Sequence, residues 1–265
     1  MTIQPRPLIL KLILGADDET LPARAAIACC ALFGIHENSV RVALNRLAAA
    51  GMIEGFERGR YRLGPKAAAL AGEVRTWRAA EARTRVWNGA WVAVHVGGLG
   101  RTDRAALRTR ERAFELVGFR ELEPDLVIRP DNLAGGVAGV RERLAKLDVD
   151  APVFLVSELD AERDARARTL WDGKALTRQY VATRERLDRW LDKADALSGE
   201  VAARESFLLG SAAIRTIVFD PLLPAPLVDT DARRALVQTV KRFDEYGHAI
   251  WRRQFARLHH AEAAA

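Results

Sequence analysis

The sequence predicts a multi-domain α+β protein, and three observations carry that prediction. Short apolar helices and two short strands fill the first 64 residues. Strands and helices alternate from residue 91, and beyond residue 161 apolar side chains recur at helical spacing. We therefore expect four segments, which are residues 1–66, 67–90, 91–160 and 161–265.

Composition and charge exclude several classes of protein. The 265 residues include 41 Lys and Arg against 35 Asp and Glu, a formal charge of +6, and 49% of them are hydrophobic. This composition is globular, which excludes disordered and fibrous chains. The only cysteines, Cys29 and Cys30, are neighbours on an expected helix and point roughly 100° apart, so a disulfide-stapled secreted fold is also excluded.

The first apolar run is too interrupted for a targeting or membrane segment. Leu8–Leu14 contains Lys11 and is followed by the acidic residues Asp17–Glu19. Neither a signal peptide nor a membrane-spanning helix has this pattern. We therefore expect a cytoplasmic protein with no membrane partner.

The first 66 residues have the element order of a winged helix-turn-helix. Three helices are expected, over Pro7–Leu14, Pro22–Phe33 and Glu37–Ala50. Two strands follow, over Met52–Glu57 and Tyr61–Leu63, around a turn at residues 58–60. The tight turn at residues 33–35 separates helices two and three, so the third helix would be the one that enters a DNA groove.

The third helix has a buried stripe and a polar outer face. With 100° added per residue, three apolar side chains fall within about 60° of Val40, namely Ala43, Leu44 and Leu47. The opposite face offers asparagines that can bind adenine, a valine that can meet a thymine methyl, and flanking arginines suited to phosphate or guanine. We expect DNA contacts from Asn38, Ser39, Arg41, Val42, Asn45 and Arg46 of this helix and from Arg58, Arg60 and Arg62 of the hairpin.

Charge alone does not distinguish DNA binding from a plain solvated surface. Residues 34–62 hold five Arg and three Glu, a net charge of only +2. The same face could also contact a protein, since some winged helices serve that purpose. The combination of polar face and basic hairpin, rather than net charge, favours double-stranded DNA as the partner.

The remaining segments predict a central α+β domain and a C-terminal helical domain. Strands are expected over Trp91–Val96, Leu126–Arg129 and Val153–Leu159, and helices over Arg104–Val117 and Leu133–Leu147. This order favours a ferredoxin-like domain at residues 91–160. Residues 67–90 are an alanine-rich helical connector. Residues 161–265 form a helical domain that is interrupted at residues 220–226, where three prolines forbid a helix.

No pattern of catalytic or metal-binding residues stands out. His95 lacks a spaced partner, and the histidines and acidic residues at 244–248 and 259–262 offer no fourth ligand. Gly97–Gly100 follows a strand but lacks the motifs of a phosphate loop. We therefore expect no catalytic residue, no metal and no cofactor, and a protein that is not an enzyme.

A further group of side chains could bind a small molecule. Tryptophans can stack an aromatic or nucleotide ligand, and they can equally pack in a core. Arginine presents a planar fork to a carboxylate or phosphate, and it can equally form a structural salt bridge, for example between Arg215 and Asp220. The candidate ligand-binding residues are Trp87, Trp91, Arg129, Trp171 and Arg215.

Four stretches of the chain resemble the bacterial phenylacetate-degradation repressors of the PaaX type. They are Phe33–Leu47, similar to F-G-I-x-E-x-x-V-R-x-A-L-x-R-L, Trp87–Trp91, similar to W-x-G-x-W, Trp171–Tyr180, similar to W-x(4)-L-x(3)-Y, and Arg215–Pro224, similar to R-x(4)-D-P-x-L-P. The resemblance implies an N-terminal winged helix, a central α+β domain and a C-terminal helical region. It also implies a repressor that leaves DNA when an aryl-acyl-CoA ester binds.

Taken together, these features predict a ligand-responsive transcriptional regulator of aromatic catabolism, a repressor that binds a palindromic or repeated operator as a homodimer. Its expected partners are operator DNA, a second copy of the chain and a small-molecule effector such as an acyl-CoA. One alternative is a nucleic-acid-processing or acyl-transfer enzyme with a winged-helix docking domain. Another is a DNA-tethered interaction module without a ligand.

Overall fold

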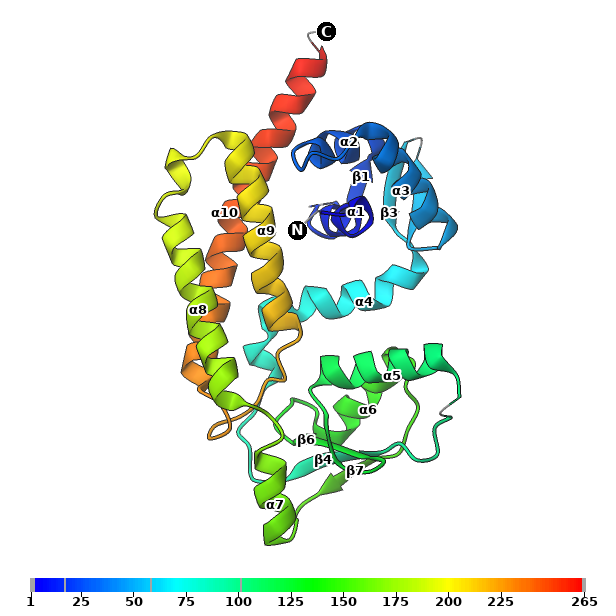
Figure 1. Cartoon of the computed structure of the whole chain (residues 1–265), viewed down its shortest axis with the longest axis vertical. Helices are drawn as coiled ribbons and strands as arrows, with labels where there is room; N and C mark the ends of the chain where they lie inside the picture. The colour runs from blue at the N-terminus through cyan, green and yellow to red at the C-terminus, as the bar shows by residue number, and fades with distance from the viewer. Residues whose placement is uncertain (1–2, 17, 58, 101, 264–265) are drawn as a thin grey trace. The chain divides into compact units, whose positions relative to one another are not determined.

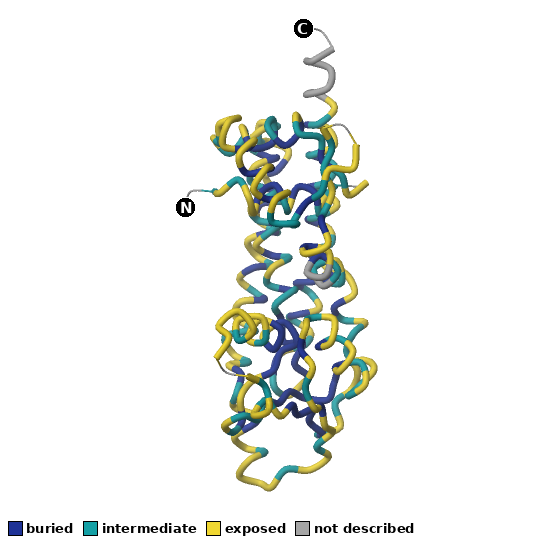
Figure 2. The backbone as a smooth tube through the Cα atoms, turned by 90° about the vertical axis from the view of Figure 1, so that its right-hand side faces the viewer, coloured by how far each residue is buried: buried dark blue, intermediate teal, exposed yellow. Residues whose placement is uncertain are grey.

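The computed structural model describes residues 3–16, 18–57, 59–100 and 102–263 (Figure 1). Contacts within the chain divide it into two compact units. The first unit combines residues 1–75 with 190–212 and 242–265, and the second combines residues 76–189 with 213–241. The long helices of the last third of the chain therefore contribute to both units. Each unit has its own buried stretches, drawn dark blue in Figure 2.

The first unit begins with helices and a three-stranded antiparallel sheet. Its N-terminal helices are α1 (Pro5–Leu14), α2 (Ala23–Ala31), α3 (Glu37–Ala49) and α4 (Pro65–Arg75). Its strands are β1 (Thr20–Pro22), β2 (Ile53–Glu57) and β3 (Arg60–Leu63), in the order β1-β3-β2. Both strand pairs are antiparallel, so β2 and β3 form the expected hairpin.

Several details of this unit differ from the sequence-based expectation. The sequence does not predict β1, because three residues that end in a proline carry no alternating apolar pattern. Pro22 ends this strand and precedes α2 instead of opening the helix. α2 also ends earlier than expected, because Gly34 adopts a φ of 71° and its N–H donates to the carbonyl of Ala31.

Helices α1, α2 and α3 pack around one apolar core. Its buried members include Leu8, Ile9, Ile13, Ala26, Cys29, Cys30, Val40, Leu44, Leu47 and Ile53. Phe207, Trp251 and Phe255 from later helices pack against this core. Burial raises the pKa of both thiols, for Cys30 to about 11, so the two cysteines act as neutral apolar side chains.

The second unit is built on a four-stranded antiparallel sheet. Its strands are β4 (Trp91–His95), β5 (Arg120–Glu123), β6 (Leu126–Pro130) and β7 (Val153–Val156), in the order β5-β6-β4-β7. Helix α5 (Arg104–Val117) follows β4, and helix α6 (Gly136–Lys146) follows β6. Figure 1 shows both helices on the same side of the sheet. Strand β4 occupies the middle of the sheet and is buried from Trp91 to Val94.

The sequence predicts three of these four strands and misses β5. Residues 120–123 are Arg, Glu, Leu and Glu, and only Leu122 is fully buried. A short, charged strand at the edge of a sheet carries no apolar run by which it could be recognised. The element order of this unit is therefore β-α-β-β-α-β, where the sequence indicates only one strand between the two helices.

Helices dominate the last third of the chain. They are α7 (Ala161–Arg168), α8 (Gly173–Leu191), α9 (Gly199–Val218) and α10 (Thr230–Ala263), and short 3-10 turns are η1 (Thr76–Ala79), η2 (Glu81–Arg83) and η3 (Ala194–Ala196). The expected interruption at residues 220–226 is confirmed. The protein is therefore a mixture of helices and two small antiparallel sheets. Within the described ranges, no helix has both the length and the apolar character that crossing a membrane requires.

Candidate nucleic-acid interface

Helix α3 buries the side that its sequence predicts. Its inner residues Val40, Ala43, Leu44 and Leu47 are at most 3% exposed. The residues on the outer side are all exposed: Asn38, Ser39, Arg41, Val42, Asn45 and Arg46. The outer side therefore presents amides, cations and one apolar group together, which is the mixture of contacts that base edges in a DNA major groove accept.

One of the two flanking arginines on α3 is held by its own helix. Glu37 lies in the first turn, where a negative charge interacts favourably with the helix dipole. Its Oε1 accepts hydrogen bonds from Nε and Nη2 of Arg41, at 2.8 and 2.6 Å. Both side chains are more than half exposed, so the pair is weak, but Arg41 must leave or share this carboxylate before it can contact DNA.

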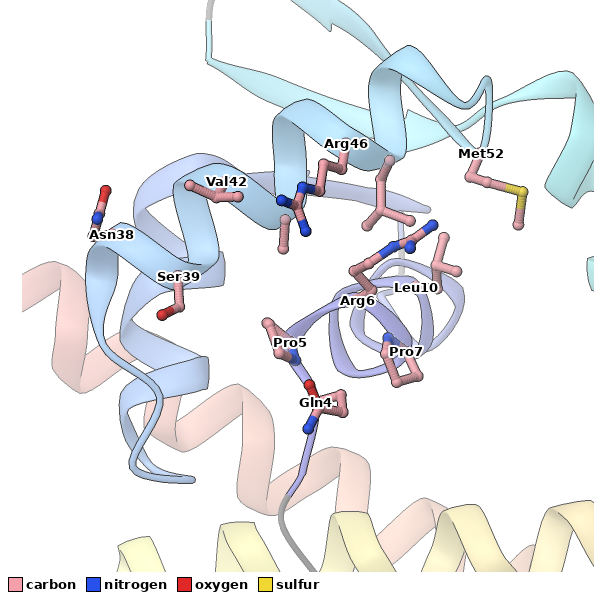
Figure 3. Close-up of a pocket in the computed structure, with 12 residues that line it drawn as sticks. Gln4, Pro5, Arg6, Pro7, Leu10, Asn38, Ser39, Val42, Arg46 and Met52 are labelled. Atoms are coloured by element: carbon pink, nitrogen blue, oxygen red, sulfur yellow. The ribbon is translucent and has the colours of Figure 1, made fainter.

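The other flank of α3 faces a groove. This groove has a volume of about 760 Å³ and lies between α3 and the first turns of α1 (Figure 3). Its lining residues are Gln4, Pro5, Arg6, Pro7, Leu10, Asn38, Ser39, Val42, Ala43, Arg46, Leu47 and Met52. Four members of the outer side of α3, at positions 38, 39, 42 and 46, therefore also form a wall of the groove.

Two arginines enter the groove from opposite walls. In Figure 3 the guanidinium groups of Arg6, from α1, and Arg46, from α3, both extend into the space between the helices. None of the described residues that line the groove is acidic. Sequence reasoning missed Arg6 because the first helix is expected from Pro7, whereas α1 begins at Pro5 and includes Arg6 in its first turn. The available signal was Pro5, since proline is favoured at the first helical position.

Two arginines of the β2–β3 hairpin, Arg60 and Arg62, have acidic partners. Nη2 of Arg60 donates to Asp18 Oδ2 at 2.7 Å and to the hydroxyl of Thr20 at 2.6 Å. Nε of Arg62 donates to Glu54 Oε1 at 2.7 Å. The hydrogen bond from the Thr20 hydroxyl lowers the pKa of Asp18, so this carboxylate stays charged beside Arg60.

The hairpin also exposes an aromatic ring, Phe56, beside one of its arginines. The guanidinium of Arg62 lies over the ring of Phe56, 5.5 Å from its centre, and this ring is 44% exposed. The remaining hairpin arginine that the sequence predicts, Arg58, lies outside the described residues. The hairpin therefore combines paired cations with one exposed aromatic ring.

The second unit brings the three candidate tryptophans together. Trp87 packs edge-on against Trp91 with ring centres 5.2 Å apart, and Trp91 stacks on Trp171 at 6.3 Å with 7° between the planes. The guanidinium of Arg168 lies 4.9 Å from the centre of the Trp87 ring. Nε1 of Trp91 donates to Asp164, whose other oxygen accepts from Arg168. Trp91 is fully buried, whereas Trp87 is half-buried.

Arg129 occupies a fully buried position among backbone carbonyls. It donates to the carbonyls of Val117, Pro130 and Pro221 and to the side chain of Asn132. Burial lowers its pKa to about 9, and the nearby charges of Arg143 and Arg83 act in the same direction. These contacts tie the second unit's sheet to the segment after α9. That placement favours a structural role, and a ligand-binding role for Arg129 stays a prediction.

Arg215 does not form the salt bridge that the sequence suggests as its structural role. It is exposed, and its guanidinium lies 4.6 Å from the centre of the Phe219 ring. Asp220 is instead buried beside Arg233, with Nη1 and Oδ1 3.9 Å apart, and Arg233 also donates to Glu81 at 2.8 Å. Sequence reasoning missed Arg233 because Glu81 lies 152 positions away, beyond any local pattern.

Comparison with known proteins gives matches at both ends of the chain. The family model described as PaaX-like protein matches residues 5–67, and that described as PaaX-like protein C-terminal domain matches residues 171–253. Among solved structures, an uncharacterized protein from Mycobacterium tuberculosis is similar, with 26% identity and a TM-score of 0.58. The match covers 94% of this chain and 99% of that one. No curated protein matches the chain.

Proposed function

The chain belongs to the PaaX-like protein family, whose members are transcriptional regulators, and from this premise we propose that it is a cytoplasmic DNA-binding repressor of aromatic catabolism. In this proposal residues 1–66 form a winged helix-turn-helix, with α3 as the recognition helix and the β2–β3 hairpin as the wing. Residues 67–90 connect it to a ferredoxin-like domain at 91–160 and a helical domain at 161–265. The strand order β5-β6-β4-β7 and the β-α-β-β-α-β element order support the ferredoxin-like assignment.

One observation carries the DNA-binding proposal, and it is the outer side of α3. The helix is anchored by four buried apolar residues, while the six residues predicted to touch DNA all remain exposed. Among them Val42 is 42% exposed, although an apolar side chain gains nothing from facing water. A thymine methyl in the major groove would cover it.

The test of this function is sequence-selective DNA binding by the full chain. Genomic fragments retained by the protein supply the operator, and fluorescence anisotropy then compares that operator with random duplex. Asn45→Ala should weaken operator binding by about 1–3 kcal/mol and leave random-duplex binding nearly unchanged, because it removes a base contact. Asn88→Ala, which alters an exposed asparagine of the second unit, is the matched control. Equal affinity of the wild-type protein for operator and random duplex would refute the proposal.

We also propose that the repressor acts as a homodimer. A single small domain contacts too little DNA for the specificity of a repressor, whereas two copies can read two half-sites. Their α3 helices would then lie about 34–36 Å apart, or a multiple of that spacing, to meet successive major grooves. Sedimentation of the protein with operator should give two chains per duplex. A persistent one-to-one complex at tens of micromolar would contradict the dimer.

The effector that we propose is an aryl-acyl-CoA or a related aromatic anion bound by the second unit. The tryptophan cluster offers a half-buried ring, Trp87, next to the cation of Arg168. Such a pairing suits an aromatic group and an anion together. Aryl-acyl-CoA esters should raise the melting temperature and release operator, and Trp87→Ala should abolish both effects. If no CoA ester does either, acyl-CoA sensing is wrong while DNA binding stands.

A further inference from the structure

We propose that the groove between α1 and α3 is a binding site for the sugar-phosphate backbone of DNA, held by Arg6 and Arg46 together. This inference rests on the proposed function and extends it to a second element, since it adds the first turn of α1 to the interface. The occupant is one strand of the same duplex whose bases α3 reads.

The guanidinium groups of the two groove arginines have no acidic partner among the described residues. Among the described residues, the guanidinium groups of Arg6 and Arg46 take part in no hydrogen bond or ion pair. By contrast, Arg41 bonds Glu37, Arg60 bonds Asp18 and Arg62 bonds Glu54. Two like charges that extend into one groove without an acidic neighbour repel each other, and a bound anion would relieve that repulsion.

Side chains rather than backbone groups supply the donors for such an anion. α1 starts with prolines at positions 5 and 7, and proline has no N–H. The residue before the helix, Gln4, makes no side-chain cap bond, so its amide is available to the groove. The first turn therefore has fewer backbone donors than usual, and the anion site depends mainly on the guanidinium groups of Arg6 and Arg46.

The position of the groove favours a DNA strand over an unrelated anion. Asn38, Val42 and Arg46 line the groove and also belong to the outer side of α3 that the proposed function places against bases. A helix in the major groove has a phosphate backbone along each flank. The flank that carries Arg46 is the one facing α1. Apolar walls at Pro7, Leu10 and Met52 suit the sugar rings between successive phosphates.

The experiment measures the salt dependence of duplex binding for Arg6→Ala. Loss of one phosphate contact should make the slope of log K against log salt less steep by about 0.9, which corresponds to a roughly eightfold loss of affinity at 0.1 M salt. Operator and random duplex should lose affinity equally, because a phosphate contact carries no sequence information. Arg6→Lys should restore most of the slope, because lysine keeps the charge.

Arg252→Ala is the matched control for removing one exposed arginine from the same unit, since Arg252 lies on α10 and outside the groove lining. Equal melting temperatures will show that each variant folds. If Arg6→Ala binds DNA like Arg252→Ala while Asn45→Ala weakens operator binding, the inference is overturned and the proposed function stands. If the wild-type protein shows no operator preference, the proposed function fails first. Stabilisation by inorganic phosphate that Arg6→Ala abolishes, with DNA binding unchanged, would assign the groove to a small anion and overturn the inference.

Discussion

The groove between α1 and α3 and the β2–β3 hairpin both carry arginines, yet the structure gives these arginines different surroundings. Arg46 and Arg6 enter a groove in which no described lining residue is acidic. Arg60 and Arg62 bond the carboxylates of Asp18 and Glu54. The residue type is the same in both regions, so it is the neighbouring residues that determine how much positive charge is available to a DNA phosphate.

This difference has an energetic consequence for binding. A cation that has no partner meets a phosphate and releases the counterions of the DNA at that point. A cation that is already paired must first lose its carboxylate, and it leaves that carboxylate near the negatively charged backbone. Exposed pairs are worth only about 0–1 kcal/mol, so the hairpin cations are hindered rather than blocked. We therefore expect the groove to contribute more to DNA affinity than the hairpin.

The largest expected effect is the contrast between Arg46→Ala and Arg62→Ala. Arg46→Ala should weaken operator binding by about 1–3 kcal/mol, whether it contacts guanine or phosphate. Arg62→Ala should cost less than about 1 kcal/mol, because the substitution also removes an existing ion pair. Anisotropy titrations of both variants at one salt concentration measure the contrast. An equal or larger loss for Arg62→Ala would show that the hairpin, and not the groove, dominates.

The sequence predicts part of this difference between the groove and the hairpin, namely the features that arise within one helix. The two faces of α3 follow from the 100° step per residue, and the structure confirms the four buried positions. The pairing of Arg41 with Glu37 is also a local feature, since the residues are four apart on one helix. The partner of Arg60, in contrast, is 42 positions away at Asp18, and the fold alone brings them together.

In the second unit, too, the sequence does not reveal contacts between residues that are far apart in the chain, and it misses a strand. The sequence singles out Arg129 as a cation for a ligand, but the folded chain surrounds it with carbonyls from segments as far away as Pro221. The tryptophans at 87, 91 and 171, which the sequence names as candidate ligand-binding residues, pack together in the fold, and their stacking depends on strand β4 and the turn before α8. Strand β5 is missed because only its position at a sheet edge, and not its composition, makes it a strand.

An intermediate effect is expected when the hairpin is made to resemble the groove. Glu54→Gln removes the carboxylate that holds Arg62 and keeps the shape of the side chain. An exposed pair is worth about 0.2–1 kcal/mol, so freeing Arg62 should tighten duplex binding by roughly 1.4- to 5-fold if the hairpin lies near a phosphate. The double variant Glu54→Gln with Arg62→Ala serves as the control and should lose the gain. Unchanged affinity in Glu54→Gln would place this strand away from the DNA.

The smallest expected effect comes from Glu37→Gln, which applies the same change within α3 itself. Pairs four residues apart on a helix are worth about 0.3–0.5 kcal/mol, so freeing Arg41 should tighten duplex binding by only about twofold. The substitution also removes a negative charge from the first turn of α3, which should cost about 0.3–1 kcal/mol of folding stability. A slightly lower melting temperature with slightly tighter binding is therefore the expected combination. Weaker binding without a change in melting temperature would mean that Glu37 itself contacts the DNA, for example by accepting a hydrogen bond from cytosine. In that case the flank of α3 that carries Arg41 would read bases, while the flank that faces α1 would hold the DNA backbone.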